Sequence, residues 1–225
     1  MMLRVARILA GVKAALIDLF DTLVWSEWRV LRERFGEAIG VAPRVVSRAY
    51  EATYHLRQTG GYESPEAITA ALVGACGLEP EPAFVRELTD LVADHLEHHV
   101  QLYEDALPAL RGLREAGVRT AVVSNCDNFA GPLVERLGLA REVDEVVLSF
   151  RVGSRKPEPG IYRAALDALG AEPEGAVFVD DQPEYLDGAA ALGIGTRYIR
   201  RGNEPWEGHH DPGDHVPITR LTALL

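Results

Sequence analysis

The strongest constraint on the fold is the alternation of helical segments with short apolar strands from residue 107 to residue 199. The predicted strands of this part are Val118–Val123, Glu145–Leu148, Ala176–Val179 and Gly195–Ile199, and an earlier one is Ala14–Ile17. The predicted helices between them are Leu107–Glu115, Phe129–Leu137, Ile161–Leu169 and Glu184–Leu192. Such alternation is typical of a parallel sheet with right-handed crossovers. We therefore predict an α/β fold, with a Rossmann-like parallel sheet core and helices on both faces.

A long helical stretch, Ser26–Val100, separates the first strand from the rest of this pattern. Prolines such as Pro43 and Pro65 stand where helices begin, and apolar residues recur at helical spacing. Four helices with short connections predict a helical bundle, and no strand is expected among them. The expected organisation is a core domain at 1–24 and 102–225 and a helical cap domain at 25–101. The segment 200–216 is expected to be loop, and the tail 218–225 a short docked helix.

Composition excludes several classes of protein. The 225 residues carry a net charge of −11, so nucleic acid is not expected as a partner. No apolar run reaches the ~18 residues that span a bilayer, so no membrane association is expected. Cys76 and Cys126 lie far apart in the sequence, which favours reduced thiols in a cytoplasmic protein. We expect a monomer or homodimer.

Polar residues follow the predicted strands at the edge where α/β sheets bind ligands. They are Asp18 and Thr22 after the first strand, Ser124 and Asn125 after the second, Lys156 in the loop after the third, and Asp180 and Asp181 after the fourth. Adjacent carboxylates repel each other, and a hard cation such as Mg²⁺ relieves that repulsion. A hydroxyl and an ammonium bind phosphoryl oxygens, and a carboxylate can act as a nucleophile. Each residue alone could be a strand-end cap or a solvated loop residue, but the four groups in this order indicate a site.

Four motifs in this arrangement resemble the haloacid dehalogenase superfamily, over about Ala14–Ile199. The motifs are Asp18-x-x-x-Thr22-Leu23, Val122-Val123-Ser124-Asn125, Val152–Pro159, and Phe178–Pro183 followed by Gly188-Ala189. The helical insert after the first motif resembles the cap of this superfamily. The resemblance implies a hydrolase that works through a carboxylate nucleophile.

The resemblance also implies a role for each motif residue. Asp18 would attack phosphorus and form an aspartyl-phosphate, and Lys156 would neutralise charge in the transition state. The residues expected to hold the phosphoryl group or the substrate are Ser124, Asn125, Thr22 and Phe20. The expected ligands of Mg²⁺ are Asp18, Asp181 and the backbone carbonyl of Phe20, with Asp180 bound to the metal or beside a ligand.

One position departs from the phosphatases of the superfamily. They usually carry a second aspartate two residues after the nucleophile, which protonates the leaving group, and this chain has Phe20 there. Asp21 could replace it from the next position. Dehalogenases of the superfamily carry an aromatic residue at this place and need no metal, but they tend to lack the acidic pair Asp180-Asp181. Trp25 and Trp28 either line the entrance to the site or pack between the domains.

The prediction is therefore a Mg²⁺-dependent phosphatase of a small phosphorylated metabolite. The adjacent carboxylates decide this choice, because they would be costly beside Asp18 without a cation. A metal-independent 2-haloacid dehalogenase remains the alternative, since Phe20 favours it. A third possibility is a protein that only binds a phosphorylated ligand or a partner protein.

Overall fold

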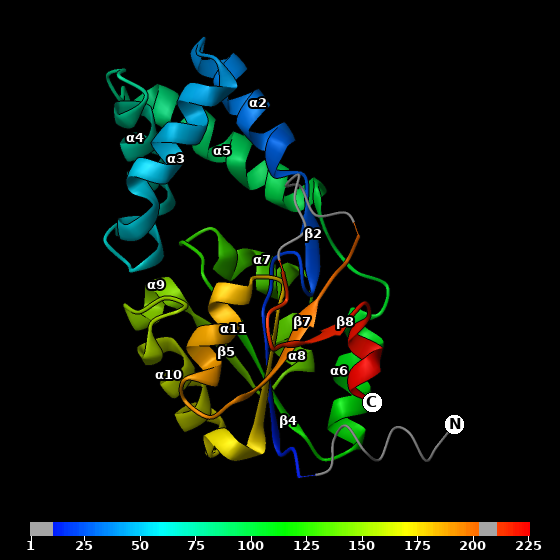
Figure 1. Cartoon of the computed structure of the whole chain (residues 1–225). Coiled ribbons are helices and arrows are strands. Elements are labelled where there is room, and N and C mark those ends of the chain that lie inside the picture. Colours follow the sequence, from blue (N-terminus) through cyan, green and yellow to red (C-terminus); the bar gives the residue numbers. More distant parts are fainter. Residues whose placement is uncertain (1–10, 203–210) are drawn as a thin grey trace.

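The computed structural model describes residues 11–202 and 211–225, which form a parallel sheet with helices on both faces and a helical bundle above its edge (Figure 1). The sheet order is β5-β4-β1-β6-β7-β8, and every neighbouring pair is parallel. The strands are β1 (Ala14–Ile17), β4 (Arg119–Ser124), β5 (Glu145–Leu148), β6 (Ala176–Asp180), β7 (Gly195–Ile199) and β8 (Val216–Ile218). The predicted α/β class is confirmed.

The central strand β1 is buried on both faces, as expected for a parallel strand between two layers of helices. Ala15 and Ile17 join one hydrophobic cluster, whereas Ala14 and Leu16 join another on the opposite face. The helices of the core are α6 (Ala106–Glu115), α7 (Ala130–Arg136), α8 (Leu139–Glu142), α9 (Ser149–Val152), α10 (Pro159–Leu169) and α11 (Pro183–Ala190). The cluster around Ile17 includes residues of α6, α7 and α8, and the other cluster includes residues of α10 and α11.

The predicted helical insert is present as four helices packed on one another. They are α2 (Trp28–Ile39), α3 (Pro43–Gln58), α4 (Pro65–Ala75) and α5 (Pro82–His98). Helix α4 begins as the sequence indicates, because Ser64 accepts a hydrogen bond from the Ala67 amide and Pro65 occupies the first turn. Their apolar residues continue the hydrophobic cluster that contains Ile17. The domain boundaries at residues 25 and 101 stay a prediction.

Several short elements differ from the sequence prediction. An antiparallel pair, β2 (Val24–Ser26) and β3 (Val100–Leu102), connects the bundle to the sheet where no strand was expected. Strand β8 begins in the segment that was expected to be loop. It has three residues with a proline in the middle, so its sequence shows little of the pattern that marks a strand. The tail forms one 3₁₀ turn, η2 (Leu221–Leu224), and another, η1 (Pro173–Gly175), precedes β6. None of the helices in the described ranges is long and apolar enough to cross a membrane.

Candidate active site

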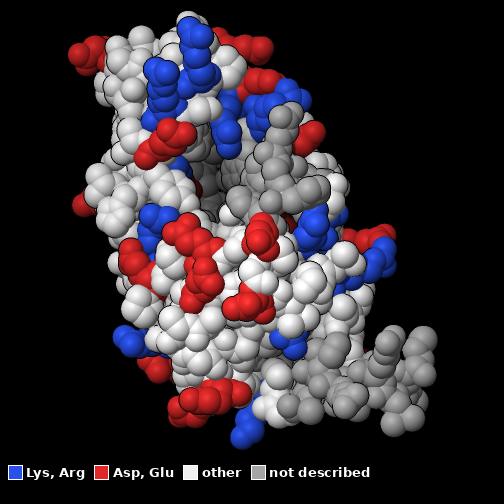
Figure 2. Space-filling view, viewed as in Figure 1, with Lys and Arg blue, Asp and Glu red and all other residues white. Residues whose placement is uncertain are grey.

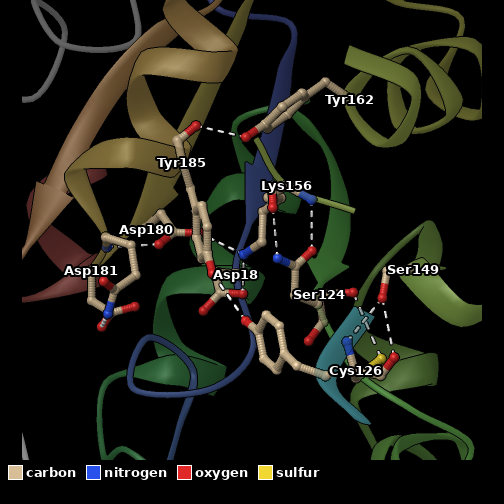
Figure 3. Close-up of polar contacts among 12 residues, drawn as sticks. Asp18, Ser124, Cys126, Ser149, Lys156, Tyr162, Asp180, Asp181 and Tyr185 are labelled. Atoms are coloured by element: carbon tan, nitrogen blue, oxygen red, sulfur yellow. Dashed lines mark hydrogen bonds and ion pairs between the residues drawn. The ribbon is translucent and has the colours of Figure 1, made fainter. Parts of the chain in front are cut away.

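The sheet register brings three of the predicted motifs to one edge. Ile17 of β1 is level with Val122 of β4 and Val179 of β6. Asp18 and Asp180 therefore lie side by side at the carboxyl ends of β1 and β6. Ser124 is the last residue of β4, on the other side of β1. This edge lies below the helical bundle, and Figure 3 shows the side chains converging there.

Lys156 is the centre of the polar network (Figure 3). Its ammonium donates to Asp18 Oδ1 and also to Asp180 Oδ2, the latter at 2.6 Å. The Lys156 side chain is 1% exposed, so its charge is removed from water together with both carboxylates. The predicted pairing of Lys156 with Asp18 is present in the structure.

Asn125 holds the backbone of Lys156 in place. Asn125 Nδ2 donates to the Lys156 carbonyl at 2.9 Å, and the Lys156 amide donates to Asn125 Oδ1 at 2.7 Å. Helix α11 supports the same loop from the other side, where a Cβ on Gly188 would lie 2.6 Å from the Pro157 carbonyl oxygen. The Asn125 side chain thus bonds the Lys156 backbone, and its predicted role in holding phosphoryl oxygens stays a prediction.

The carboxylates outnumber the ammonium that neutralises them. Oxygens of Asp18, Asp180 and Asp181 lie within 4.8 Å of one another. Burial raises the pKa of Asp18 to about 7 although Lys156 lowers it, and burial likewise raises the pKa of Asp180 to about 7. Burial, with the charges of Asp18 and Asp21, raises the pKa of Asp181 to about 8. Burial alone would lower the pKa of the Lys156 ammonium. The carboxylates of Asp18 and Asp180 outweigh this effect and hold the pKa above its ordinary value. The cluster therefore favours an added positive charge.

The three aspartates differ in how far the protein itself engages them. Asp180 accepts from Lys156 with one oxygen and from the Gln182 amide, at 2.8 Å, with the other. Asp181 Oδ2 accepts from Gln182 Nε2 at 2.9 Å. Buried carboxylate oxygens are ligands that suit Mg²⁺, so this donor set fits a divalent cation. Asp18 and Asp181 fit the role of ligand better than Asp180, since donors of the chain already occupy both Asp180 oxygens.

Two buried hydroxyls at this edge lack partners. Ser124 and Thr22 are both fully buried, and their hydroxyl oxygens have no hydrogen-bond partner in the described part of the chain. A buried hydroxyl without a partner costs ~1–3 kcal/mol. Ser124 stands at the end of β4, next to the strand that carries Asp18, so a ligand bound at this edge can satisfy it.

Phe20 and Asp21 face different surroundings. Phe20 contacts the Trp28 ring edge-on, with centroids 5.1 Å apart, and both residues line a cavity beneath the bundle. Asp21 adopts a φ of 57°, and its charge acts on Asp181. The turn after β1 thus directs an aromatic side chain to the cavity and a carboxyl to the acidic cluster. Trp25 is not among the residues that line this cavity.

Sequence reasoning missed the residues that α3 contributes. Tyr54 OH lies 3.3 Å from Tyr185 OH, and the Tyr185 ring lies 5.0 Å from the Lys156 ammonium. Arg57 of α3 forms an ion pair with Asp127 of the core at 2.6 Å. None of these residues belongs to a strand-end motif, so the pattern that located the aspartates gave no signal for them.

Comparison with known proteins agrees with this geometry. A model of haloacid dehalogenase-like hydrolases matches residues 12–193. The chain belongs to this family. The match covers the three strand ends that carry Asp18, Ser124 and Asp180, together with the Lys156 loop and the four helices of the bundle. The predicted family and the prediction of a hydrolase are therefore confirmed.

Relatives of this hydrolase include both phosphatases and dehalogenases. Glyceraldehyde 3-phosphate phosphatase of Methanopyrus kandleri is 35% identical over 160 residues, which cover 68% of each chain. (S)-2-haloacid dehalogenase 1 of a Pseudomonas species is 35% identical over 150 residues, or 62% of this chain and 63% of that protein. The two activities are matched equally well, so sequence identity does not choose between them.

Solved structures of the family share the fold. One is an L-2-haloacid dehalogenase from Xanthobacter autotrophicus with chloropropionic acid covalently bound, with a TM-score of 0.66 at 20% identity over 95% of this chain and 96% of that one. Another is a family enzyme from Bacteroides thetaiotaomicron in a magnesium complex, with a TM-score of 0.70 at 20% identity over 87% and 96% of the two chains. At this identity the likeness concerns the fold alone.

Proposed function

We propose that this hydrolase is a Mg²⁺-dependent phosphatase that acts on a small phosphorylated molecule. The observation that carries the proposal is the excess of buried carboxylates, three within 4.8 Å of one another around a single ammonium. Such a cluster needs further positive charge to ionise fully at neutral pH. A divalent cation supplies that charge, and a phosphoryl group then has a positive site at which to bind.

Asp18 is the proposed nucleophile. One of its oxygens attacks phosphorus, the bond from phosphorus to the ester oxygen breaks, and the leaving oxygen departs with the bonding electrons. Bound Mg²⁺ supplies electrostatic stabilisation of the phosphoryl oxygens. Lys156 stabilises the charge that develops on the same group, because its ammonium already contacts Asp18. Water then attacks the aspartyl-phosphate, which releases phosphate and restores Asp18.

The remaining residues bind and position. The unpartnered Ser124 hydroxyl is a donor for a phosphoryl oxygen. Asp180 orients Lys156 through its 2.6 Å contact, and Asn125 fixes the Lys156 backbone. Asp181 is the proposed ligand of Mg²⁺ together with Asp18 and the Phe20 carbonyl. Phe20 carries no proton to transfer, so the leaving oxygen receives none from this position.

A 2-haloacid dehalogenase is the second candidate, and one observation favours it. The side chain two residues after Asp18 is aromatic and lines the cavity beneath the bundle with Trp28. In that reaction Asp18 would displace halide from carbon without a metal. The unneutralised carboxylates argue against it, because ionising Asp18 beside Asp180 and Asp181 is costly when no cation is bound.

Two assays separate the candidates. Phosphate release from p-nitrophenyl phosphate is measured with Mg²⁺ and with excess chelator, and halide release from 2-chloropropionate is measured with chelator. We expect phosphate release that requires Mg²⁺ and is lost in Asp18→Asn. Halide release that persists in chelator, without phosphate release, would establish the dehalogenase instead. If neither product forms although Mg²⁺ and inorganic phosphate bind, the protein is a binding protein.

A further inference from the structure

A cavity of about 250 Å³ lies between the helical bundle and the catalytic edge of the sheet. Figure 2 shows the molecule hollowed in this region, with basic side chains gathered on the bundle above. Helices α2, α3, α4 and α5 all contribute to its walls, and the loop after β4 contributes the side toward the core. Residues of both parts of the protein therefore line the cavity.

The cavity adjoins the reacting groups. Phe20, two residues after Asp18, lines it, and so does Asn125, the neighbour of Ser124. In the proposed reaction the phosphoryl group lies at Asp18 and Ser124. The leaving group of the ester must then extend from that edge past Phe20, which places it in this cavity.

The larger part of the walls is apolar. Leu31, Ile68, Leu72, Val92 and Leu96 of the four bundle helices line the cavity, and all five are buried. Phe20 and Trp28 form an aromatic wall with their edge-on contact. A hydroxyl or carboxylate placed against these side chains would lose its hydration without gaining a partner, which is costly.

Polar side chains also line the cavity, among them Tyr54 and Gln58, whose buried Oε1 has no hydrogen-bond partner in the described part of the chain. Arg57 donates to Asp127 at 2.6 Å, to Thr53 Oγ1 at 3.1 Å and to the Tyr50 carbonyl at 3.2 Å, and its side chain is 8% exposed. Its charge and its donors are therefore used within the protein. Arg32 is exposed, so its charge stands at the solvent side of the cavity.

We infer that the substrate is a phosphate monoester of an apolar alcohol, with an aromatic or branched hydrocarbon body that fills this cavity. The inference rests on the proposed phosphatase function and names its substrate class. Phosphates of sugars, glycerol or hydroxy acids are poorer substrates, since they leave the aliphatic and aromatic side chains of these walls uncovered.

The test compares two esters whose leaving oxygens are similarly basic, benzyl phosphate and glycerol 3-phosphate. Both are alkyl esters, so a difference in kcat/KM between them arises from binding of the leaving group in the cavity and not from the basicity of the leaving oxygen. Burial of the phenyl ring predicts a preference for benzyl phosphate of at least about tenfold. Binding of benzylphosphonate and 2-hydroxyethylphosphonate, measured by calorimetry with Mg²⁺, gives the same comparison without turnover.

A matched pair of variants localises the effect. Trp28→Ala removes one wall and should reduce the preference for benzyl phosphate over glycerol 3-phosphate about tenfold or more. Trp25→Ala removes a tryptophan that does not line the cavity, and the preference should persist. The comparison of phosphonates on the unmodified protein stands even if Trp28→Ala fails to fold.

The outcomes separate this inference from the proposed function. Equal or weaker binding of benzylphosphonate overturns the apolar substrate, even if phosphate esters are hydrolysed. If benzylphosphonate binds selectively but no ester is hydrolysed, the proposed phosphatase function is wrong, whereas the inference of an apolar ligand site is supported. If neither phosphonate binds, the apolar substrate is overturned, and Mg²⁺-dependent phosphate release decides separately whether the protein is a phosphatase.

Discussion

Replacing Asp181 by asparagine should make the metal-free protein more stable and at the same time remove its response to Mg²⁺. Asp181 is buried, and its carboxylate lies within 4.8 Å of oxygens of Asp18 and Asp180. At an effective dielectric constant of ~20, two like charges at that distance repel with about 3.5 kcal/mol. Lys156 offsets part of this repulsion, whereas burial adds to the cost of the charge, so we expect a gain of about 3 kcal/mol at high pH.

The gain should depend on pH with a definite sign. The pKa of Asp181 is raised from 3.8 to about 8 in the folded protein, so the folded state holds a proton that the unfolded state releases. The free energy of unfolding therefore falls as pH rises from 3.8 to about 8. The amide that replaces the carboxyl in the variant does not titrate in this range. The advantage of Asp181→Asn should consequently be small near pH 4 and largest above pH 8.

Urea denaturation in chelator at pH 5.0 and pH 8.5 measures this difference. Asp167→Asn, at an exposed aspartate of α10, is the matched control and should show no comparable gain. Saturating Mg²⁺ should stabilise the wild type, by ~2.7 kcal/mol at 100 times its Kd, and leave Asp181→Asn nearly unchanged. Equal stability of wild type and variant at pH 8.5, or the same gain at both pH values, would refute the electrostatic argument.

Three further variants test the network around this cluster. Asn125→Ala removes both hydrogen bonds to the Lys156 backbone, so kcat should fall at least about tenfold while the Mg²⁺-induced shift in Tm is retained. Arg57→Gln leaves Asp127 without its buried partner and should lower the free energy of unfolding in urea by about 2 kcal/mol, with Mg²⁺ binding intact. Phe20→Asp restores a proton donor and should raise turnover of benzyl phosphate more than that of phenyl phosphate, and an unchanged ratio would mean that another group already supplies the proton.

The sequence was sufficient to locate the aspartates because strand ends follow a simple rule. Asp18 comes directly after β1 and Asp180 is the last residue of β6, and parallel strands present their carboxyl ends at one edge. Lys156 comes from a loop between elements of the same alternation, so its meeting with Asp18 also follows from the topology. The helices of the bundle could be predicted for a similar reason, since apolar spacing and prolines mark them locally.

What the sequence could not indicate depends on contacts between distant segments. Strands β2 and β3 have three residues each, and they pair with one another from the two ends of the helical insert. Helical periodicity shows that α3 has a buried face, but not that Arg57 meets Asp127. The role of Asn125 in binding phosphoryl oxygens was implied by the family resemblance and stays a prediction. Its hydrogen bonds to backbone groups of Lys156 are contacts that no side-chain pattern reveals.

Phe20 has two consequences that can be separated by experiment. It provides no proton to the leaving oxygen, and loss of such a donor commonly costs ~10²–10⁴-fold for a strongly basic leaving group. It also forms, with Trp28, the aromatic wall of the cavity. Phenyl phosphate suits both conditions, because its leaving oxygen is weakly basic and its body is apolar. Benzyl phosphate suits only the second condition, and glycerol 3-phosphate suits neither. The value of kcat/KM should therefore be highest for phenyl phosphate, lower for benzyl phosphate and lowest for glycerol 3-phosphate. The ratio of phenyl to benzyl phosphate then measures the effect of the missing proton donor, and the ratio of benzyl to glycerol 3-phosphate measures the effect of the cavity.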